Sequence, residues 1–563
     1  MEAFPADAGN YTPSLEEDPA LGLSHREKME ILFAVMLGLF LGALDQTIVG
    51  PALPTIVTQL SGNDYYVWAI TIYLLTSTIS VPFWGKLSDI YGRKPIFMIG
   101  IVIFLVGSAL SGLSQNMGML ILFRGIQGIG AGSLFPVALA VIGDLFSPQE
   151  RGKYQGLFGA VFGIAFVAGP LIGGFLTENY GWHWIFYVNI PIGIVALVVI
   201  QRLLPTVKTR NATRNFDLIG GVIFTVSMIF LLVGLTNKQF GDWAEPTVGG
   251  FVIAGLVGTV LFIVAEWRAK EPIIPLDLWK GRTYSATMVT VFFAAFAFFG
   301  LIVFLPRWFQ VVEGFSPTNS GLAALPLVIG LIFSSIVSGV VVSRTGRYKW
   351  LIVGSVAVMG VGVLLMTQLT KETPVPIVWL WMFIAGLGVG PTFSVPTIVI
   401  QNAVPFRQLG VATSNLTFFR QIGGTIALSF VGTIFATSFQ DELVPQMSAA
   451  GVPQPVLDGF TQASSSGSFD FSSLTGVGDL GAAILAAIPA QFQATVAPFI
   501  DAMVEGVHGA FSLATAQTMW LGVGGAIVAL VAAVAIKEIP LRNSNEAPVQ
   551  TAASKPELAG ASD

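Results

Sequence analysis

The sequence predicts an all-α membrane protein with about fourteen transmembrane helices. Hydrophobic residues make up 54% of the 563 residues, charged residues make up only 10%, and the mean hydropathy is +0.76. Soluble domains carry about a quarter charged residues, so water is not the main solvent for this surface. The 63 glycines and 31 prolines agree with this, because neighbouring helices satisfy the backbone groups that such residues free inside a membrane.

Fourteen apolar runs are long enough to cross a bilayer as helices, each of which needs about 20 residues. The first run follows a polar, partly acidic segment and is too long for the apolar part of a signal peptide, so we expect it to stay in the membrane. The predicted spans are 31–53, 66–85, 95–114, 118–142, 154–176, 184–204, 217–236, 247–266, 284–309, 319–342, 350–370, 377–400, 410–436 and 514–536.

The basic residues orient these spans. With a cytoplasmic N-terminus, 22 of the 27 lysines and arginines fall on the cytoplasmic side. Lys238, Arg307 and Lys371 fall on the opposite side, and Arg124 and Arg420 lie within spans. Because cytoplasmic loops are enriched in Lys and Arg, we expect a multi-pass protein of the cytoplasmic membrane, of bacterial origin, with both termini in the cytoplasm.

The composition argues against several kinds of chemistry. The chain has no cysteine, which excludes disulfides and thiol catalysis, and its histidines, His25, His183 and His508, lie outside the predicted spans. No phosphate-binding GxxxxGK[ST] loop is present, and the glycine strings at 128–132 and 386–390 follow no strand, so they indicate close helix packing. We therefore predict no enzyme activity, no catalytic or metal site, no cofactor and no nucleic-acid partner.

The loop between the second and third spans reads GKLSDIYGRKP. Its glycines, Gly85 and Gly92, form a turn that presents Asp89 beside Arg93 and Lys94. Short cytoplasmic loops are commonly basic and glycine-rich, but that tendency does not explain the G-x-L-x-D-x-x-G-R-K spacing. This spacing resembles the signature loop of the major facilitator superfamily. The resemblance implies that Asp89 and Arg93 belong to a cytoplasmic gate between two helix bundles and do not contact the substrate.

Further segments resemble the fourteen-span drug:proton antiporters of that superfamily, the EmrB/QacA type. The first span contains LGALDQTIVGPALPTI with Asp45 as its acid, and the fourth contains RGIQGIGAG with Arg124, which the resemblance ties to proton coupling. The segments WHWIFYVNIPIG at 182–193 and FFRQIGG at 418–424 also match, although His183 stands where the family usually has Arg.

The fifth span contains GIAFVAGPLIGG, which resembles the antiporter motif of these proteins. Small residues at this spacing let helices approach closely, and the proline lets the helix bend. The residues that carry the match are Gly169, Pro170, Gly173 and Gly174.

The resemblance also implies a major facilitator fold with two six-helix bundles and two inserted helices. The segment VVSRTGRYKW at 341–350 occupies the second-half position of the signature loop, but no acid in it matches Asp89, so we expect an asymmetric gate. The predicted divisions are a tail at 1–30, a first bundle at 31–204, a linker with the inserted helices at 205–283, a second bundle at 284–536 and a tail at 537–563.

Two charged residues inside spans carry the mechanistic hypothesis. At 1.5 Å of rise per residue, Asp45 lies about 21 Å from the cytoplasmic face and Arg124 about 7–8 Å from the outer face. In a hydrocarbon core of about 30 Å these depths agree, so the two side chains can pair. Each charge alone costs about 2.5–3.5 kcal/mol on insertion scales.

The pairing has three interpretations. An inert salt bridge would only stabilise the fold. In a proton switch, Arg124 favours the ionised carboxylate while it is close, and a desolvated Asp45 takes up a proton once conformation or substrate separates the pair. As a third interpretation, Asp45 contacts a cationic substrate directly. We adopt the proton switch as the working hypothesis.

A third intramembrane charge, Arg420, lies about 15 Å into the thirteenth span. It either pairs with helix carbonyls or with Gln421, or it gives a cavity polar character and attracts an anionic head group. The residues leave both alternatives open, and Arg420 and Gln421 are candidates for a cavity.

The segment 437–513 is the only long extramembrane connection. It contains seven acidic residues and no Lys or Arg, as expected of an exported loop. Its middle is rich in serine, and 480–510 has the pattern of an amphipathic helix broken by prolines. We predict a helical loop on the outer membrane face; the alternative is a docking site for lipid or for a periplasmic or lipoprotein partner.

These features predict a proton-coupled multidrug efflux antiporter. Its substrates would be small hydrophobic or amphipathic compounds, because few polar side chains are available to specify a hydrophilic one, and its other partners would be protons and membrane lipids. The alternative is an exporter of lipids or glycolipids across the cytoplasmic membrane. A non-transporting membrane sensor or scaffold is a further alternative, and it would not need Asp45 and Arg124 inside the bilayer.

Overall fold

The computed structural model describes residues 23–60, 66–205, 216–238, 241–405, 408–458, 480–487, 493 and 496–541. Helices dominate, with no strand among these residues, so the all-α prediction is confirmed. The first half comprises α1 (His25–Gln59), α2 (Tyr66–Tyr91), α3 (Arg93–Gly112), α4 (Met117–Leu145), α5 (Pro148–Asn179), α6 (Trp184–Tyr187) and α7 (Asn189–Leu203). The inserted pair comprises α8 (Leu218–Asn237) and α9 (Phe251–Arg268), the latter preceded by a π-helical turn at Pro246–Gly250.

The second half contains the other α-helices of the described residues. They are α10 (Arg282–Val311), α11 (Pro317–Ala323), α12 (Leu325–Thr345), α13 (Lys349–Met366), α14 (Val375–Ala403), α15 (Leu409–Ala449), the short α17 (Leu480–Ala487) and α19 (Ile500–Ala535).

Thirteen helical segments of the described residues are long and apolar enough to cross a membrane, each matching a predicted span. The fourteenth predicted span corresponds to α2, whose apolar run is diluted by Thr76, Ser77, Thr78 and Ser80. α2 is 26 residues long and packs between α4 and α15, inside the bundle, where the hydroxyls of Thr76, Ser77 and Ser80 bond to helix carbonyls.

Local sequence sets several helix starts. The side chain of Ser24 caps α1 and that of Ser147 caps α5, and in each case a glutamate three residues later completes a capping box. Asn116 caps α4 and Asp217 caps α8 by accepting a backbone N–H bond. The turn between α2 and α3 depends on Gly92, whose φ of 93° favours glycine.

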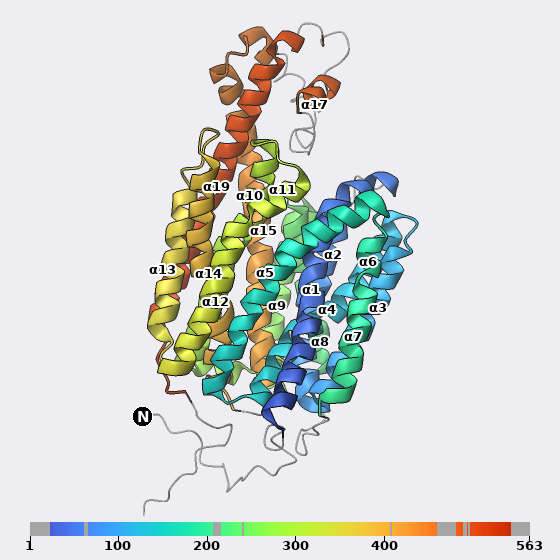
Figure 1. Cartoon of the computed structure of the whole chain (residues 1–563), viewed down its shortest axis with the longest axis vertical. Coiled ribbons are helices and arrows are strands. Elements are labelled where there is room, and N and C mark those ends of the chain that lie inside the picture. The colour runs from blue at the N-terminus through green and yellow to red at the C-terminus, as the bar shows by residue number, and fades with distance from the viewer. Residues whose placement is uncertain are drawn as a thin grey trace, which may run out of the picture.

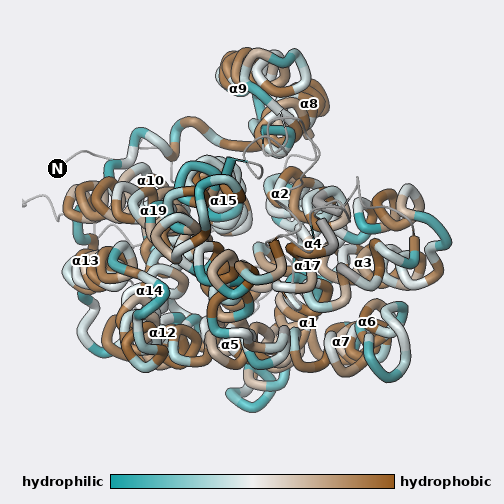
Figure 2. Tube along the Cα trace, turned by 90° about the horizontal axis from the view of Figure 1, so that it is seen from above, coloured by the Kyte–Doolittle hydropathy of each residue, from teal (hydrophilic) through white to brown (hydrophobic). Residues whose placement is uncertain are grey.

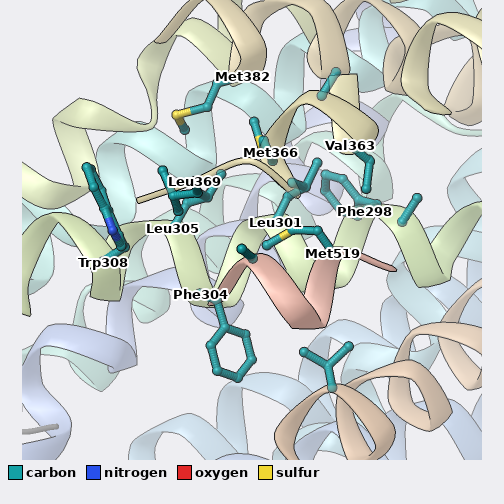
Figure 3. Packing of buried hydrophobic residues seen from close by; sticks show 14 of the residues in the cluster. Phe298, Leu301, Phe304, Leu305, Trp308, Val363, Met366, Leu369, Met382 and Met519 are labelled. Carbon is teal, nitrogen blue, oxygen red and sulfur yellow. The ribbon is translucent and has the colours of Figure 1, made fainter. Parts of the chain in front are cut away.

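Each half has its own hydrophobic core, and the inserted pair lies to one side (Figure 2). In the second half, Leu301, Leu305 and Trp308 of α10 pack against Met366 of α13 and Met519 of α19 (Figure 3). The inserted pair packs mainly on α2 and α15, with a small shared core in which Phe224 contacts Phe83 and Phe418.

The two halves contact each other along α5 and α12. Glycines make this approach so close that a Cβ on Gly339 would collide with the carbonyl oxygen of Gly152, and one on Gly156 would lie 2.9 Å from the backbone of Ile336. Ser335 adds a hydrogen bond of 3.1 Å to the carbonyl of Gly156. The small residues therefore act at the boundary between the halves.

α15 and α19 extend beyond the other helices as a two-helix stalk, at the top of Figure 1. We define the stalk as residues 437–449 of α15 and 500–513 of α19. α15 continues to Ala449 and α19 begins at Ile500, whereas the spans were predicted to end at 436 and begin at 514. The difference arises because Phe439, Leu443 and Met447 recur every four residues and are buried against the α19 residues Met503, Val507 and Phe511.

The rest of segment 437–513 is described only in part. Val452 and Leu457 follow α15, and Leu480 and Ile484 lie on α17; all four are buried in the same core as the stalk. The serine-rich middle of the segment lies outside the described residues. We call the end of the bundle that carries the stalk the stalk end, and the opposite end, where α1 and α15 begin, the basic end.

Candidate functional site

A buried polar network surrounds Asp45, which is fully inaccessible to solvent. The Nη1 atom of Arg124 lies 2.7 Å from Asp45 Oδ2. The other carboxylate oxygen, Oδ1, accepts hydrogen bonds from Gln127 Nε2 at 2.7 Å and from Asn189 Nδ2 at 2.9 Å. The carboxylate therefore joins α1 to α4 and to the start of α7 through three donors.

Helix geometry places two of these donors on one face of α4. Arg124 and Gln127 are three residues apart, and Arg124 Nη1 also donates to Gln127 Oε1 at 2.8 Å, which orients the amide toward Asp45. Asn189 is held from the other side, because its Nδ2 also donates to Ser108 Oγ at 3.1 Å while that hydroxyl donates to the carbonyl of Phe186. The network thus links α1, α3, α4 and α7 with the short helix α6.

The guanidinium of Arg124 is enclosed by aromatic rings. It lies 4.2 Å from the ring centroid of Tyr73 and 5.7 Å from that of Phe186, and its side chain is 3% exposed. A lone charge in such surroundings is strongly unfavourable, so each member of the Asp45–Arg124 pair stabilises the other. The Tyr73 hydroxyl, Arg124 Nε and Asn189 Oδ1 are buried with no hydrogen-bond partner, which leaves donor and acceptor capacity beside the carboxylate.

The antiporter-motif residues pack against the helix that carries Asp45. A Cβ on Gly169 would collide with Thr47 of α1, and one on Gly173 would collide with the carbonyl of Ile48. The hydroxyl of Thr47 donates to the carbonyl of Ala165 at 2.9 Å. This close contact begins two residues after Asp45, so a movement of α5 acts directly on the segment that holds the carboxylate.

The other two motif residues face the second half. Pro170 lies beside Gly321 of α11, and a Cβ on Gly174 would come within 3.3 Å of the Thr318 hydroxyl. The motif therefore touches α1 with one pair of residues and the second half with the other pair.

At the basic end, Asp89 joins the two halves. Its Oδ1 and Oδ2 accept the backbone N–H groups of Gly410 at 3.1 Å and Val411 at 2.8 Å, in the first turn of α15. These N–H groups have no partner within the helix, and the positive end of the helix dipole favours an anion there. Arg93 binds Asp89 at 2.6 Å and Asp144 at 2.9 Å, which fixes the carboxylate from the first half.

Close packing accompanies this contact, which we call the basic-end latch (Asp89, Arg93, Asp144, Gly410 and Val411). A Cβ on Gly85 would collide with Ser414 of α15, and one on Gly410 would collide with Asp89 and Arg93. Lys94 donates to the carbonyl of Gln201 at 2.6 Å and so ties α3 to α7 within the first half. Asp89 and Arg93 therefore belong to the latch, whereas Lys94 joins two helices of the first half.

A second contact between the halves is uncharged. Gln155 Nε2 of α5 donates to Gln401 Oε1 of α14 at 2.9 Å, and Gln401 Nε2 donates to the carbonyl of Leu139 at 3.0 Å and to Thr413 Oγ1 at 3.2 Å. Both glutamines are buried. Sequence reasoning missed this amide bridge, although glutamines in otherwise apolar runs were the available signal.

Arg420 lies at the centre of the second half. Its Nη2 is 3.3 Å from the carbonyl oxygens of Thr392 and Phe393, and its guanidinium lies 4.6 Å from the ring centroid of Phe393. The Thr392 carbonyl lacks its helical partner because the residue four positions later, Pro396, has no N–H. The neighbouring Gln421 does not bond to Arg420, and its Oε1 is buried without a partner.

Sequence reasoning also missed the neutral members of the Asp45 network, Gln127, Asn189 and Ser108. The first two lie inside the segments quoted for the family resemblance, but neutral side chains carry no desolvation cost large enough to single them out. Their part in the network becomes clear only once the structure shows that α3, α4 and α7 pack around Asp45 of α1.

Comparison with known proteins shows the family to which the sequence belongs. Residues 35–428 match the sequence profile of the Major Facilitator Superfamily. The chain belongs to this superfamily. It is therefore a multi-pass membrane transporter and not an enzyme.

The chain is similar to several named members. It is 39% identical to the multidrug transporter protein MdtP of Bacillus subtilis, over 74% of this chain and 78% of that protein. It is 34% identical to the uncharacterized MFS-type transporter Rv1877 of Mycobacterium tuberculosis, over 92% of this chain and 70% of that protein. The fold resembles the crystal structure of the human organic anion transporter MFSD10, with a TM-score of 0.54 at 15% identity over 72% of this chain and 94% of that one.

Proposed function

We propose that this transporter is a proton-coupled exporter of hydrophobic or amphipathic compounds. The observation that carries the proposal is the Asp45 network: an acid fully buried in the membrane interior, bonded to Arg124 and to two amides on different helices. Two relatives from Bacillus subtilis, named multidrug transporter protein MdtP and multidrug resistance protein 3, are 39% and 36% identical to the chain and support a drug-like substrate class.

The network supports proton coupling because the charge of Asp45 holds the donors together. Protonation removes the ionic attraction to Arg124 and leaves that guanidinium without a counter-charge, which favours a rearrangement of α1 against α4. The α1–α5 contact at Gly169 and Gly173 then transmits the rearrangement to the helix that packs on the second half. Moving one charge through the membrane potential is worth about 2.3 kcal/mol per 100 mV, enough to bias such a step.

The proposed orientation puts the basic end in the cytoplasm, with both termini there, in a bacterial cytoplasmic membrane. It is supported by the excess of Lys and Arg in the loops at that end. The latch and the amide bridge are both formed at the basic end, so in the proposed orientation this structure corresponds to a state whose cytoplasmic side is closed.

Efflux from proteoliposomes with an imposed pH gradient tests the proposal. We expect D45N to abolish gradient-driven efflux, because Asn keeps the shape of the side chain but cannot exchange a proton. D277N is the matched control, since Asp277 forms an exposed surface pair with Lys280. Gradient-driven efflux at the wild-type rate from correctly inserted D45N protein would refute proton coupling through this residue.

The stalk favours one second candidate, export of a lipid or glycolipid. The two helices project past the bundle and hold α17 beside them, as a guide for an acyl chain would require. Replacing 452–496 with a short Gly-Ser linker should leave dye efflux unchanged under the drug hypothesis. Loss of lipid export with retained dye efflux would favour the guide. Binding of a periplasmic or lipoprotein partner to this segment stays a prediction.

A further inference from the structure

We infer that the second half contains a substrate site for amphiphiles with an anionic head group, and that Arg420 binds that group. The inference rests on the proposed export function and adds the charge class of the substrate. It follows from a cavity, from the electrostatic surroundings of Arg420 and from the positions of the acidic residues.

A small cavity lies between α10, α14 and α15; its volume of about 10 Å³ has room for about one water molecule, so the site that we infer must widen to admit an amphiphile. Its walls are mostly apolar and aromatic, and Arg420 is its single charged lining residue. Arg420 follows Leu409, the first residue of α15, by eleven positions, so it lies about 16 Å along the helix from the basic end, near mid-membrane. The lining residues are Val291, Ala294, Ala295, Phe298, Phe299, Thr392, Phe393 and Arg420.

The aromatic wall of this cavity continues into the first half. The ring centroid of Phe393 lies 5.5 Å from those of Phe298 on α10 and Phe162 on α5, and Phe162 stacks on Phe135 of α4 at 5.0 Å. An apolar ligand body beside Arg420 therefore lies where the two halves meet. This is the location at which a ligand is affected by their relative movement.

Arg420 is held in place but not neutralised. Its hydrogen bonds go to two carbonyl oxygens through Nη2 alone, and in the described part of the chain no Asp or Glu forms an ion pair with it. A guanidinium has five N–H donors in a planar fork suited to carboxylate, sulfonate or phosphate groups. The carbonyl left open by Pro396 orients the group, and the remaining donors are available to a ligand.

The placement of acids excludes an equivalent site for cations. Among the described spans, Asp45 is the acid at mid-bundle depth; the others lie within two turns of a helix end or in the stalk. Asp45 is inaccessible to solvent and already accepts three hydrogen bonds. A lipophilic cation in the cavity would meet the positive charge of Arg420 without a carboxylate to offset it, whereas an anion would be attracted.

Binding to the full chain in lipid nanodiscs tests this inference without any pH gradient. Three probes share one naphthalene ring and one alkyl chain and carry a sulfonate, a neutral amide or a trimethylammonium group. Equilibrium dialysis measures each, with empty nanodiscs as the blank. We expect the sulfonate to bind at least tenfold more tightly than the trimethylammonium probe, and R420Q to weaken sulfonate binding about tenfold while changing amide binding less than twofold.

Two further variants separate charge from folding. R420K keeps the positive charge and should keep the order of the three affinities, whereas R307Q removes an exposed arginine at the stalk end of α10 and should bind all probes as the wild type does. The glutamine side chain in R420Q retains N–H donors for the Thr392 carbonyl, so this variant should fold. Equal or tighter binding of the cation by the wild type, or unchanged sulfonate affinity in R420Q, would overturn the inference.

The outcome is distinguishable from failure of the proposed function. A sulfonate preference that depends on Arg420, together with D45N efflux equal to the wild type, would leave the anion site standing and refute the proton coupling. Gradient-driven export of the trimethylammonium probe at a rate at least equal to that of the sulfonate probe would refute the anion site and leave the proton coupling standing.

Discussion

The basic-end latch makes a quantitative prediction about the balance between conformations. In D89N, the side chain keeps one acceptor oxygen for the first turn of α15 but loses its charge, its ion pair with Arg93 and one charge-assisted hydrogen bond. Hydrogen bonds to charged groups contribute about 1.5–3 kcal/mol each. Because Asp89 and Arg93 are only 11% and 13% exposed, little of this is offset by water, and we expect a loss of about 2 kcal/mol.

A loss of about 2 kcal/mol changes the ratio of closed to open basic ends about thirtyfold. The chain contains no cysteine, so spin labels can be placed on R202C and W350C in the otherwise native sequence. Arg202 is exposed at the basic end of α7, and Trp350 is 70% exposed on α13, so the pair reports the separation of the two halves at this end.

Double electron–electron resonance should show one short distance in the wild type and a large added population at longer distance in D89N. D277N, a surface acid outside the latch, serves as the control and should match the wild type. A D89N distance distribution identical to the wild type would show that the hydrogen bonds of Asp89 to α15 do not hold the halves together.

Two further predictions concern neutral groups. Q401M leaves the buried Gln155 amide without its partner, which costs about 1–3 kcal/mol, so the same label pair should show a more open basic end. Q155M/Q401M should recover part of the closed population, because no unpaired Gln155 amide is left, whereas the bonds of Gln401 to Leu139 and Thr413 stay lost. Burial raises the pKa of Tyr348 to about 12, while its hydroxyl accepts the N–H of Ile539. Since the raised pKa favours the neutral phenol in the folded state, the docking of residues 537–539 should be intact below pH 10 and lost between about pH 10 and 12, as followed by tyrosinate absorbance and proteolysis; Y348F should lack this transition.

The long helices were predictable because a helix that crosses the hydrocarbon core needs a run of about 20 apolar residues, and such a run can be recognised without knowing its neighbours. Charged residues near their ends, and capping residues such as Ser24 and Ser147, mark where the chain leaves the apolar environment. The 437–449 part of the stalk was not recognised as a continuation of the thirteenth span for the same reason. Asp441 and Glu442 lower its mean hydropathy, whereas the four-residue spacing of Phe439, Leu443 and Met447 indicates a helix.

Within the site, the pairing of charged side chains could be predicted from the sequence, whereas the contacts of neutral polar side chains could not. The depths of Asp45 and Arg124 could be compared from their distances to the span ends, and the structure places these side chains 2.7 Å apart. The amide bridge joins residues 246 positions apart, and nothing in either local sequence specifies the partner. Such contacts depend on how the two halves dock, which local patterns do not encode.

In the proposed mechanism, the two intramembrane arginines act at different steps of the transport cycle, because their surroundings differ. Arg124 is nearly inaccessible and shares a carboxylate with two amides, so in the proposed mechanism its environment changes when a proton neutralises Asp45. Arg420 lines a cavity and bonds only to carbonyl oxygens, so a ligand can change its environment directly. The rings of Phe135, Phe162 and Phe393 connect the two regions across the boundary. A bound anion and a bound proton would therefore act on the same boundary from opposite sides, as exchange transport requires.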